Sequence, residues 1–286
     1  MGDGPDPAGR GRPATQPYRS KPGGMVLFLF AALFTGGAIS WAIHAYNTPR
    51  YTSGGREVDF EIVGGLLLLA TGSVGMGRKL LAPSAEFVLA HDSRNPVVYL
   101  RPFDEDARRI EYYPVGMRKG GRKLMRTSEP ASREGYLKRA LGQIGPFIAV
   151  GAPGDTLAPL GAARLYLADE EWQREVEALV KGASAIVLVP ETTEGTRWEV
   201  TKVARWVDLR RVLIIVPNPA LRPLGYARIQ ALTAENLPVA LPCDCASADA
   251  FMFDAMGLPQ AISFGRDKAA LQPFIKQVKH LPELRA

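Results

Sequence analysis

EEWQREVEALVKGASAIVLVPETTEGTRWEVTKVARW, residues 170–206, has the pattern of a helix, a strand, a polar turn and a second helix. One helical face in its first part collects the apolar side chains of Trp172, Val176, Leu179 and Val180. Five apolar residues follow at 185–189, and we expect Trp198 and Glu199 to open the next helix. An apolar run without alternation predicts a strand buried on both faces, as strands of parallel sheets are.

Further strands and helices are predicted on both sides of this unit. Short apolar runs predict strands at 97–100, 147–150, 212–216 and 261–264. Helical spacing of apolar residues predicts helices at 136–144 and 268–279. Strands that alternate with helices favour a flavodoxin-like α/β fold, in which helices cover both faces of a parallel sheet. We expect this domain to occupy residues 85–286.

The N-terminal part has a different composition. Residues 1–23 are rich in proline and glycine and predict a disordered tail. Residues 25–46 carry no formal charge over a length that crosses a bilayer, and they exceed the apolar core of a signal peptide. A second, shorter apolar segment lies at 60–76 and includes Glu61 near its start. We therefore expect a transmembrane hairpin at 24–82.

The charges around these segments predict the orientation of the hairpin. Basic residues precede the first segment and follow the second, which places both termini in the cytoplasm by the positive-inside rule. The flanking residues are Arg10, Arg12, Arg19, Lys21, Arg78 and Lys79. The expected location is therefore the cell inner membrane, with membrane lipid as a partner. With only two cysteines, Cys243 and Cys245, too close together for a relaxed disulfide, a reducing compartment fits the main domain.

Small residues within the two segments have two readings. They could let the two helices, or two copies of the hairpin, approach closely. Alternatively, glycine is simply common in membrane helices. The residues concerned are Gly36, Gly37, Ser40, Gly64, Gly65, Thr71, Gly72 and Gly75.

Four predicted loops should meet at one edge of the sheet. They leave the carboxyl ends of the strands at 101–106, 151–155, 191–197 and 217–223. Ligands of open α/β sheets bind at this edge, and we expect Glu199 in the first helical turn above it.

The sequence lacks the residues that several common catalytic and metal sites require. The chain has no phosphate-binding P-loop, only three histidines, and no second pair of ligands to complete a zinc site with Cys243 and Cys245. No metal is therefore expected. The turn from Gly151 to Gly154 weakly resembles a dinucleotide fingerprint, although it could equally need only the backbone freedom of glycine.

Glu199 is the candidate catalytic residue. It shares a helical face with Val203 and Trp206, which turns it inward. A carboxylate beside a strand-exit edge could stabilise an oxocarbenium-like transition state in cleavage of a glycosidic bond. The alternative is that the helix dipole favours an acidic residue in a first turn whatever the function.

The order VVYLRPFDED, IAVG, the Trp172 helix, AIVLVPETTEGTRWE and VLIIVP resembles the Toll/interleukin receptor (TIR) domain and its relatives among nucleoside-processing enzymes. The resemblance implies that Glu199 attacks or stabilises the ribosyl carbon of NAD. It also implies substrate contacts from Trp198 and from Arg101 or Asp104, with Gly151 and Gly154 at the same edge. NAD would be a substrate rather than a resident cofactor, and the domain would self-associate in signalling or defence.

A membrane-tethered nucleotide-sensing or protein-interaction module without catalysis is the alternative function. A basic loop at 118–126 could contact anionic lipid headgroups, or it could be a solvated loop. Nucleic acid is not favoured as its partner, because no aromatic stacking platform accompanies the loop.

Overall fold

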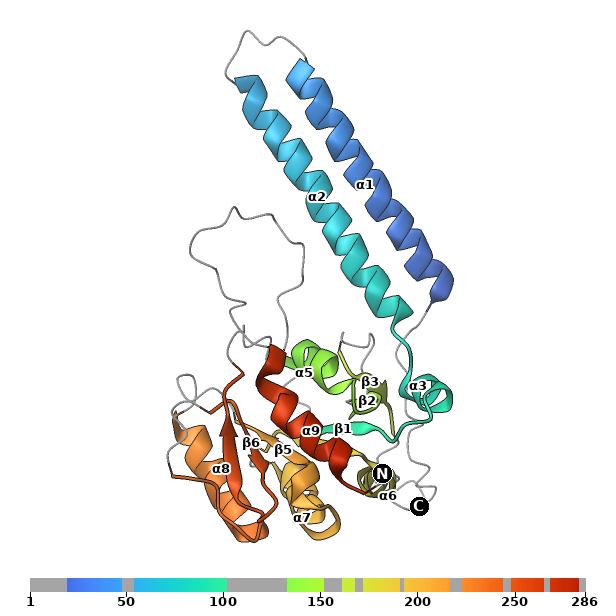
Figure 1. Ribbon diagram of the computed structural model, residues 1–286. Coiled ribbons are helices and arrows are strands. Elements are labelled where there is room, and N and C mark those ends of the chain that lie inside the picture. The colour runs from blue at the N-terminus through green and yellow to red at the C-terminus, as the bar shows by residue number, and fades with distance from the viewer. Residues whose placement is uncertain are drawn as a thin grey trace, which may run out of the picture.

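The computed structural model describes residues 20–47, 54–101, 133–151, 161–167, 172–190, 193–216, 223–243, 248–264 and 268–282. Two long helices extend side by side from an α/β domain (Figure 1). The helices are α1 (Lys21–Asn47), α2 (Gly54–Leu81), α3 (Ala85–His91), α5 (Arg133–Leu141), α6 (Trp172–Gly182), α7 (Glu194–Trp206), α8 (Pro223–Asn236) and α9 (Gln272–His280), with short 3₁₀ turns η1 (Leu209–Arg211) and η2 (Lys268–Leu271). The strands are β1 (Val97–Leu100), β2 (Phe147–Val150), β3 (Ala163–Leu165), β4 (Ala185–Leu188), β5 (Val212–Ile215), β6 (Ala250–Phe253) and β7 (Pro259–Ile262).

The strands form one mostly parallel sheet in the order β3-β2-β1-β4-β5-β6-β7. The first five strands in this order are parallel, and β6 and β7 continue the sheet as an antiparallel pair. The segment β2-β1-β4-β5 has the order of a flavodoxin-like sheet, with β3 added at the edge beyond β2. The predicted α/β class is confirmed. The expected parallel sheet is confirmed for its first five strands, whereas β6 runs antiparallel to β5 and to β7.

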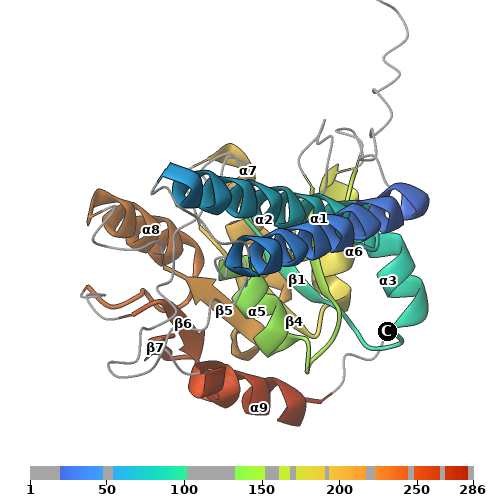
Figure 2. The same cartoon turned by 90° about the horizontal axis from the view of Figure 1, so that it is seen from above.

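Helices cover both faces of the sheet. Every residue of its central strands is therefore buried. Alternate side chains point to opposite faces and build two apolar clusters. On one face, β1, β2, β4 and β5 pack against α5 and α9. On the other face, the same strands pack against α6, α7 and α8. Figure 2 shows α9 and α7 on opposite sides of the sheet.

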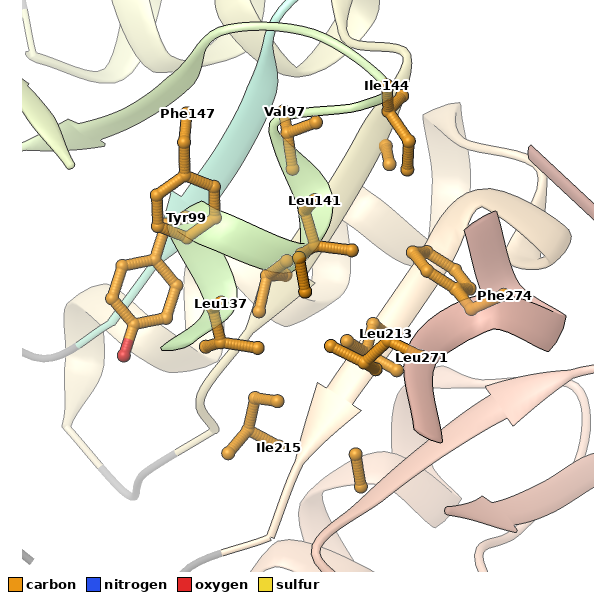
Figure 3. Packing of buried hydrophobic residues seen from close by; sticks show 14 of the residues in the cluster. Val97, Tyr99, Leu137, Leu141, Ile144, Phe147, Leu213, Ile215, Leu271 and Phe274 are labelled. Atoms are coloured by element: carbon orange, nitrogen blue, oxygen red, sulfur yellow. The ribbon is translucent and has the colours of Figure 1, made fainter. Parts of the chain in front are cut away.

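The first of these clusters lies between α5, α9 and the middle of the sheet (Figure 3). Tyr99 of β1 stacks on Phe147 of β2, with their ring centroids 5.4 Å apart. Leu137 and Leu141 of α5 lie over the strands, and Phe274 of α9 lies over β5. This packing fixes α5, and therefore its N-terminal residues, against the carboxyl end of β1.

The two long helices run antiparallel and pack along their length (Figure 1). Among the described helices, only α1, over Lys21–His44, is long and apolar enough to cross a membrane. The first predicted span thus agrees with α1. The predicted segment at 60–76 lies within α2, which starts at Gly54 and includes charged residues in its first turns.

Small residues do form the contact between α1 and α2, but most are not those expected. A Cβ atom at Gly24 would lie 2.6 Å from Cγ of Leu81, so the helices need a glycine there. Ala31, Ala38 and Ala70 are buried between the helices. A Cβ at Gly37 would meet Leu66 at 3.7 Å. For five of the expected glycines, an added Cβ would have no neighbour within 4 Å, so they do not bring α1 and α2 close together. They are Gly36, Gly64, Gly65, Gly72 and Gly75.

Candidate functional site

The strands β1 and β4 lie at the point where the winding of the sheet changes direction. They pair in parallel, with Leu100 opposite Leu188, so their carboxyl ends meet. The next described helix after β1 is α5, on one face, whereas α7 follows β4 on the other face. Open α/β sheets bind ligands outside such a switch point. The ends of β1 and β4 are therefore the first place to look for a site.

Glu199 is a buried residue in the N-terminal half of α7, the helix that follows β4. Its residue surface is 6% exposed, and its Oε2 atom is buried with no hydrogen-bond partner among the described residues. The helix itself begins four residues earlier than expected, at Glu194 instead of Trp198, because Thr193 caps it and accepts a hydrogen bond from the amide of Thr196 at 3.3 Å. The expectation that Glu199 lies in the first turn is therefore wrong.

The position of Glu199 in the second turn weakens the alternative explanation, which is that the helix dipole favours an acidic residue in the first turn. The acidic residue in the first turn is Glu194, which is exposed and available to the helix dipole. Glu199 lies one turn further on, where the dipole has largely decayed. A buried carboxyl group without a partner costs stability. Helix formation alone gives no reason to keep a glutamate at this position.

Burial also changes the acid–base chemistry of Glu199. It raises the pKa of this carboxyl group to about 8, because the charged form loses the solvation that water would give it. Glu199 is therefore mostly a neutral acid at neutral pH when the site is empty. Strongly shifted pKa values cluster at functional sites, so this shift makes Glu199 a candidate site residue.

Trp198 joins α7 to α6. Its ring lies 5.0 Å from the ring of Trp172, and the two rings are tilted by 44°. The Nζ atom of Lys202 lies 5.6 Å from the Trp198 ring centre. Both tryptophans pack against the apolar cluster of this face. The sequence placed Trp172 on a packing face only, so its contact with the candidate residue Trp198 was missed.

Arg101 directly follows β1 but faces the other side of the sheet. Its guanidinium lies 5.8 Å from the ring centre of Tyr99, which belongs to the cluster under α5 and α9. Its Nε atom lies 4.0 Å from Oε2 of Glu134. Arg101 therefore contacts a helix on one face of the sheet, whereas Glu199 belongs to α7 on the other face. We had expected Arg101 and Glu199 to lie in one site, but the structure does not bring them together.

Glu134, the residue beside Arg101, belongs to a buried network of charged groups that was not predicted from the sequence. Glu134 in the first turn of α5 accepts hydrogen bonds from Nη1 and Nη2 of Arg164 at 2.9 and 3.2 Å. It also accepts one from the amide of Ala162 at 2.6 Å. The sequence signal for this network is Arg164 within the apolar segment AARLY. A buried guanidinium needs an acidic partner, so this arginine could have predicted an ion pair.

Gly151 has a packing role. Its amide donates to the carbonyl of Leu165 at 2.8 Å, which continues the pairing of β2 with β3. A Cβ atom here would lie 2.4 Å from the ring of Tyr166. The glycine is therefore needed so that this ring can pack against the backbone. The predicted site residues Asp104 and Gly154, and the basic loop 118–126, lie outside the described residues.

The described part of the chain contains no group of three histidine, cysteine, aspartate or glutamate residues that could hold a metal ion. His91 and His280 bond to carbonyl groups of their own helices, and Cys243 is an exposed free thiol. Glu199 and its neighbours remain the chemically distinctive group. No family model, curated protein or solved structure matches this chain.

Proposed function

We propose that the chain is a membrane-anchored, TIR-like signalling or defence protein whose α/β domain cleaves the N-glycosidic bond of NAD. The observation that supports this proposal is Glu199, a buried residue of the helix that follows β4, whose Oε2 atom has no hydrogen-bond partner among the described residues. The order β2-β1-β4-β5 is compatible with nucleotide-binding flavodoxin-like sheets and supports the same assignment.

In this reaction the bond between the ribosyl carbon and the pyridinium nitrogen breaks, and its electron pair leaves with nicotinamide. Positive charge develops on the ribosyl ring, and the ionised carboxylate of Glu199 stabilises it. Water then adds to the ribosyl carbon and releases a proton. A carboxylate in an apolar site is effective here, because few water molecules screen its charge.

The proposal is tested by measuring nicotinamide release from NAD with the full-length protein reconstituted in liposomes at high density. We expect Glu199→Gln to lower the rate by about a hundredfold or more. Glu177→Gln is the matched control, because Glu177 lies on neighbouring α6 and pairs at 2.5 Å with Lys181 on the surface. Product formation that is unchanged in the Glu199 variant would refute the assigned role.

A non-catalytic nucleotide-sensing or protein-interaction module is the second candidate. It is favoured by the raised pKa of Glu199, which leaves the empty site neutral, and by the engagement of Arg101 with Glu134 on the other face. This function predicts that NAD raises the melting temperature of both the wild type and Glu199→Gln. It also predicts that neither protein releases nicotinamide.

We further propose that α1 and α2 both cross the inner membrane and leave the two termini in the cytoplasm. The length and composition of α1 and the antiparallel packing of α2 along it support this arrangement. The hairpin would hold many α/β domains on one surface, where they could self-associate.

A further inference from the structure

The short helix α3 joins the end of α2 to the sheet. Three residues separate Leu81, the last residue of α2, from Ala85, the first residue of α3. An extended chain of this length reaches at most about 14 Å, so α3 must lie near the end of α2. Figure 1 shows it there. Ser84 fixes the start of α3, because its side chain accepts a hydrogen bond from the amide of Phe87 at 3.1 Å.

One face of α3 is attached to the edge of the sheet. Ala85 is completely buried in a cluster with Ile148 of β2 and Ala163 of β3, and Val88 and Leu89 pack against this cluster. The strand β3 forms one edge of the sheet, and β7 forms the other. Any surface that binds α3 would therefore also orient the sheet.

The opposite face of α3 presents two stacked rings. Phe87 and His91 lie one helical turn apart, with their ring centroids 4.0 Å from each other and their planes 23° apart. The Nδ1 atom of His91 lies 2.8 Å from the carbonyl oxygen of Phe87. Both residues are exposed. The pair forms a flat aromatic surface that faces away from the sheet.

Phe87 is unusual among the aromatic residues of the α/β domain. Its residue surface is 52% exposed, and no other phenylalanine, tyrosine or tryptophan is exposed among the described residues that follow α2. Isolated exposed apolar residues are normal on protein surfaces. This one, however, follows closely after Leu81, which is also exposed, at the end of a helix that packs along an apolar, membrane-length helix.

We propose that the Phe87–His91 face of α3 lies on the cytoplasmic surface of the bilayer, with the Phe87 ring among the lipid headgroups. This contact holds the β3 edge of the sheet next to the membrane and gives the α/β domain a fixed orientation. The inference goes beyond the proposed enzymatic function. It rests on the proposed crossing of the membrane by α1 and α2.

The length of α2 favours lipid as the partner of this face. A helix needs about 20 residues to cross the hydrocarbon core, whereas α2 has 28, so its ends extend into the headgroup regions. Arg78 and Lys79 lie in its last turn, where cations attract anionic headgroups. Aromatic rings are enriched at the same depth of a membrane. The proposed topology thus already places a bilayer surface beside α3.

The test measures whether a label on α3 contacts lipid or water. A nitroxide is attached to Ala90→Cys in full-length protein without Cys243 and Cys245. Ala90 is exposed and lies three residues from Phe87, so Phe87 stays in place. The protein is reconstituted at one copy per nanodisc of mixed zwitterionic and anionic phospholipid, which excludes contacts between copies. Power saturation then compares access by oxygen, which concentrates in lipid, with access by a water-soluble nickel chelate.

Two further label positions calibrate this ratio of oxygen access to nickel access. Leu29→Cys, at an exposed position of α1, should report lipid. Met256→Cys, in the 79% exposed turn between β6 and β7, should report water. We expect the ratio at Ala90 to exceed that at Met256 by at least about threefold, because an interfacial helix enters the headgroup boundary.

A second substitution tests the role of the Phe87 ring. In the protein labelled at Ala90, Phe87→Ser should shift the equilibrium from the docked to the free domain by about tenfold, because it removes the apolar ring. The ratio at Ala90 should then approach that at Met256. Leu258→Ser is the matched control, since Leu258 is also exposed and apolar but lies in the turn between β6 and β7. It should leave the ratio unchanged.

Three results would overturn the inference. These are access at Ala90 like that at Met256, a ratio at Ala90 that survives Phe87→Ser, or equal effects of Phe87→Ser and Leu258→Ser. The Leu29 label separates this failure from failure of the membrane proposal. Lipid contact at Leu29 with water at Ala90 would reject only the docking of α3, whereas water at Leu29 would reject both. Nicotinamide release does not enter the measurement, so the catalytic proposal is tested independently.

Discussion

Arg164 donates to both carboxylate oxygens of Glu134, and this ion pair connects edge strand β3 to the first turn of α5. The Arg164 side chain is completely buried, with 0% of its surface exposed. Arg101, at the end of β1, lies 4.0 Å from the same carboxylate. The position of the residue that leaves β1 thus depends on an acid far from it in sequence.

Replacing Glu134 with glutamine should destabilise the domain by about 3 kcal/mol, because it leaves a buried guanidinium without its counter-charge. The free energy of unfolding of the full-length protein in detergent, from urea titration, measures this loss. Glu175→Gln is the control, since Glu175 forms an exposed pair with Arg174 and should cost less than about 0.5 kcal/mol. Equal effects of the two changes would show that the network contributes little.

Gly151→Ala should also destabilise the fold, by about 2 kcal/mol, because the new methyl group overlaps the Tyr166 ring. Gly182→Ala, at the end of α6, has no atom within 4 Å of the added Cβ and should have little effect. Thermal unfolding of the two variants makes the comparison. If Gly151→Ala and the wild type have the same melting temperature, the Tyr166 ring does not pack against Gly151.

The raised pKa of Glu199 predicts a pH dependence of stability. Between its ordinary value of 4.5 and about 8, the folded state holds a proton on Glu199 that the unfolded state has lost. Stability is therefore greatest below this window and falls as pH rises through it, by about 1.4 kcal/mol per pH unit. The free energy of unfolding in urea is measured for the wild type and for Glu199→Gln across this pH range. The difference between the two proteins isolates the contribution of Glu199. A difference that does not vary with pH would contradict the burial of this carboxyl group.

The proposed topology predicts where cysteines can be labelled. In a variant without Cys243 and Cys245, a cysteine placed between α1 and α2 should react with a membrane-impermeant reagent added outside intact cells or spheroplasts. A cysteine placed near the C-terminus should react only after the membrane is opened. Labelling of both sites from outside, or protection of both, would contradict the two-span arrangement.

Much of the fold was predictable from the sequence, since short continuous apolar runs rich in β-branched residues favour buried strands, as at β1, β4 and β5. The short strand β3 was missed because Arg164 interrupts its apolar pattern, and β6 was missed because no clear period surrounds it. The start of α7 was misplaced because the cap formed by Thr193 was not recognised.

The site was less predictable, because its contacts join distant segments. The alternation of side chains along β1 puts Tyr99 and Arg101 on one face, whereas Glu199 belongs to a helix on the other. This alternation can be read from the sequence, but the face taken by each helix cannot. The pairing of Glu134 with Arg164, and the contact of Trp172 with Trp198, likewise depend on tertiary packing.

Nicotinamide release from NAD by the full-length protein clustered on liposomes, measured at a pH above the pKa of Glu199, shows whether this residue takes part in cleavage. We predict that the wild type and Glu177→Gln release nicotinamide, and that Glu199→Gln loses about a hundredfold or more of this activity. Absence of release from the clustered wild type would show that the protein does not cleave NAD, and release that is unchanged by Glu199→Gln would show that Glu199 is not the catalytic group.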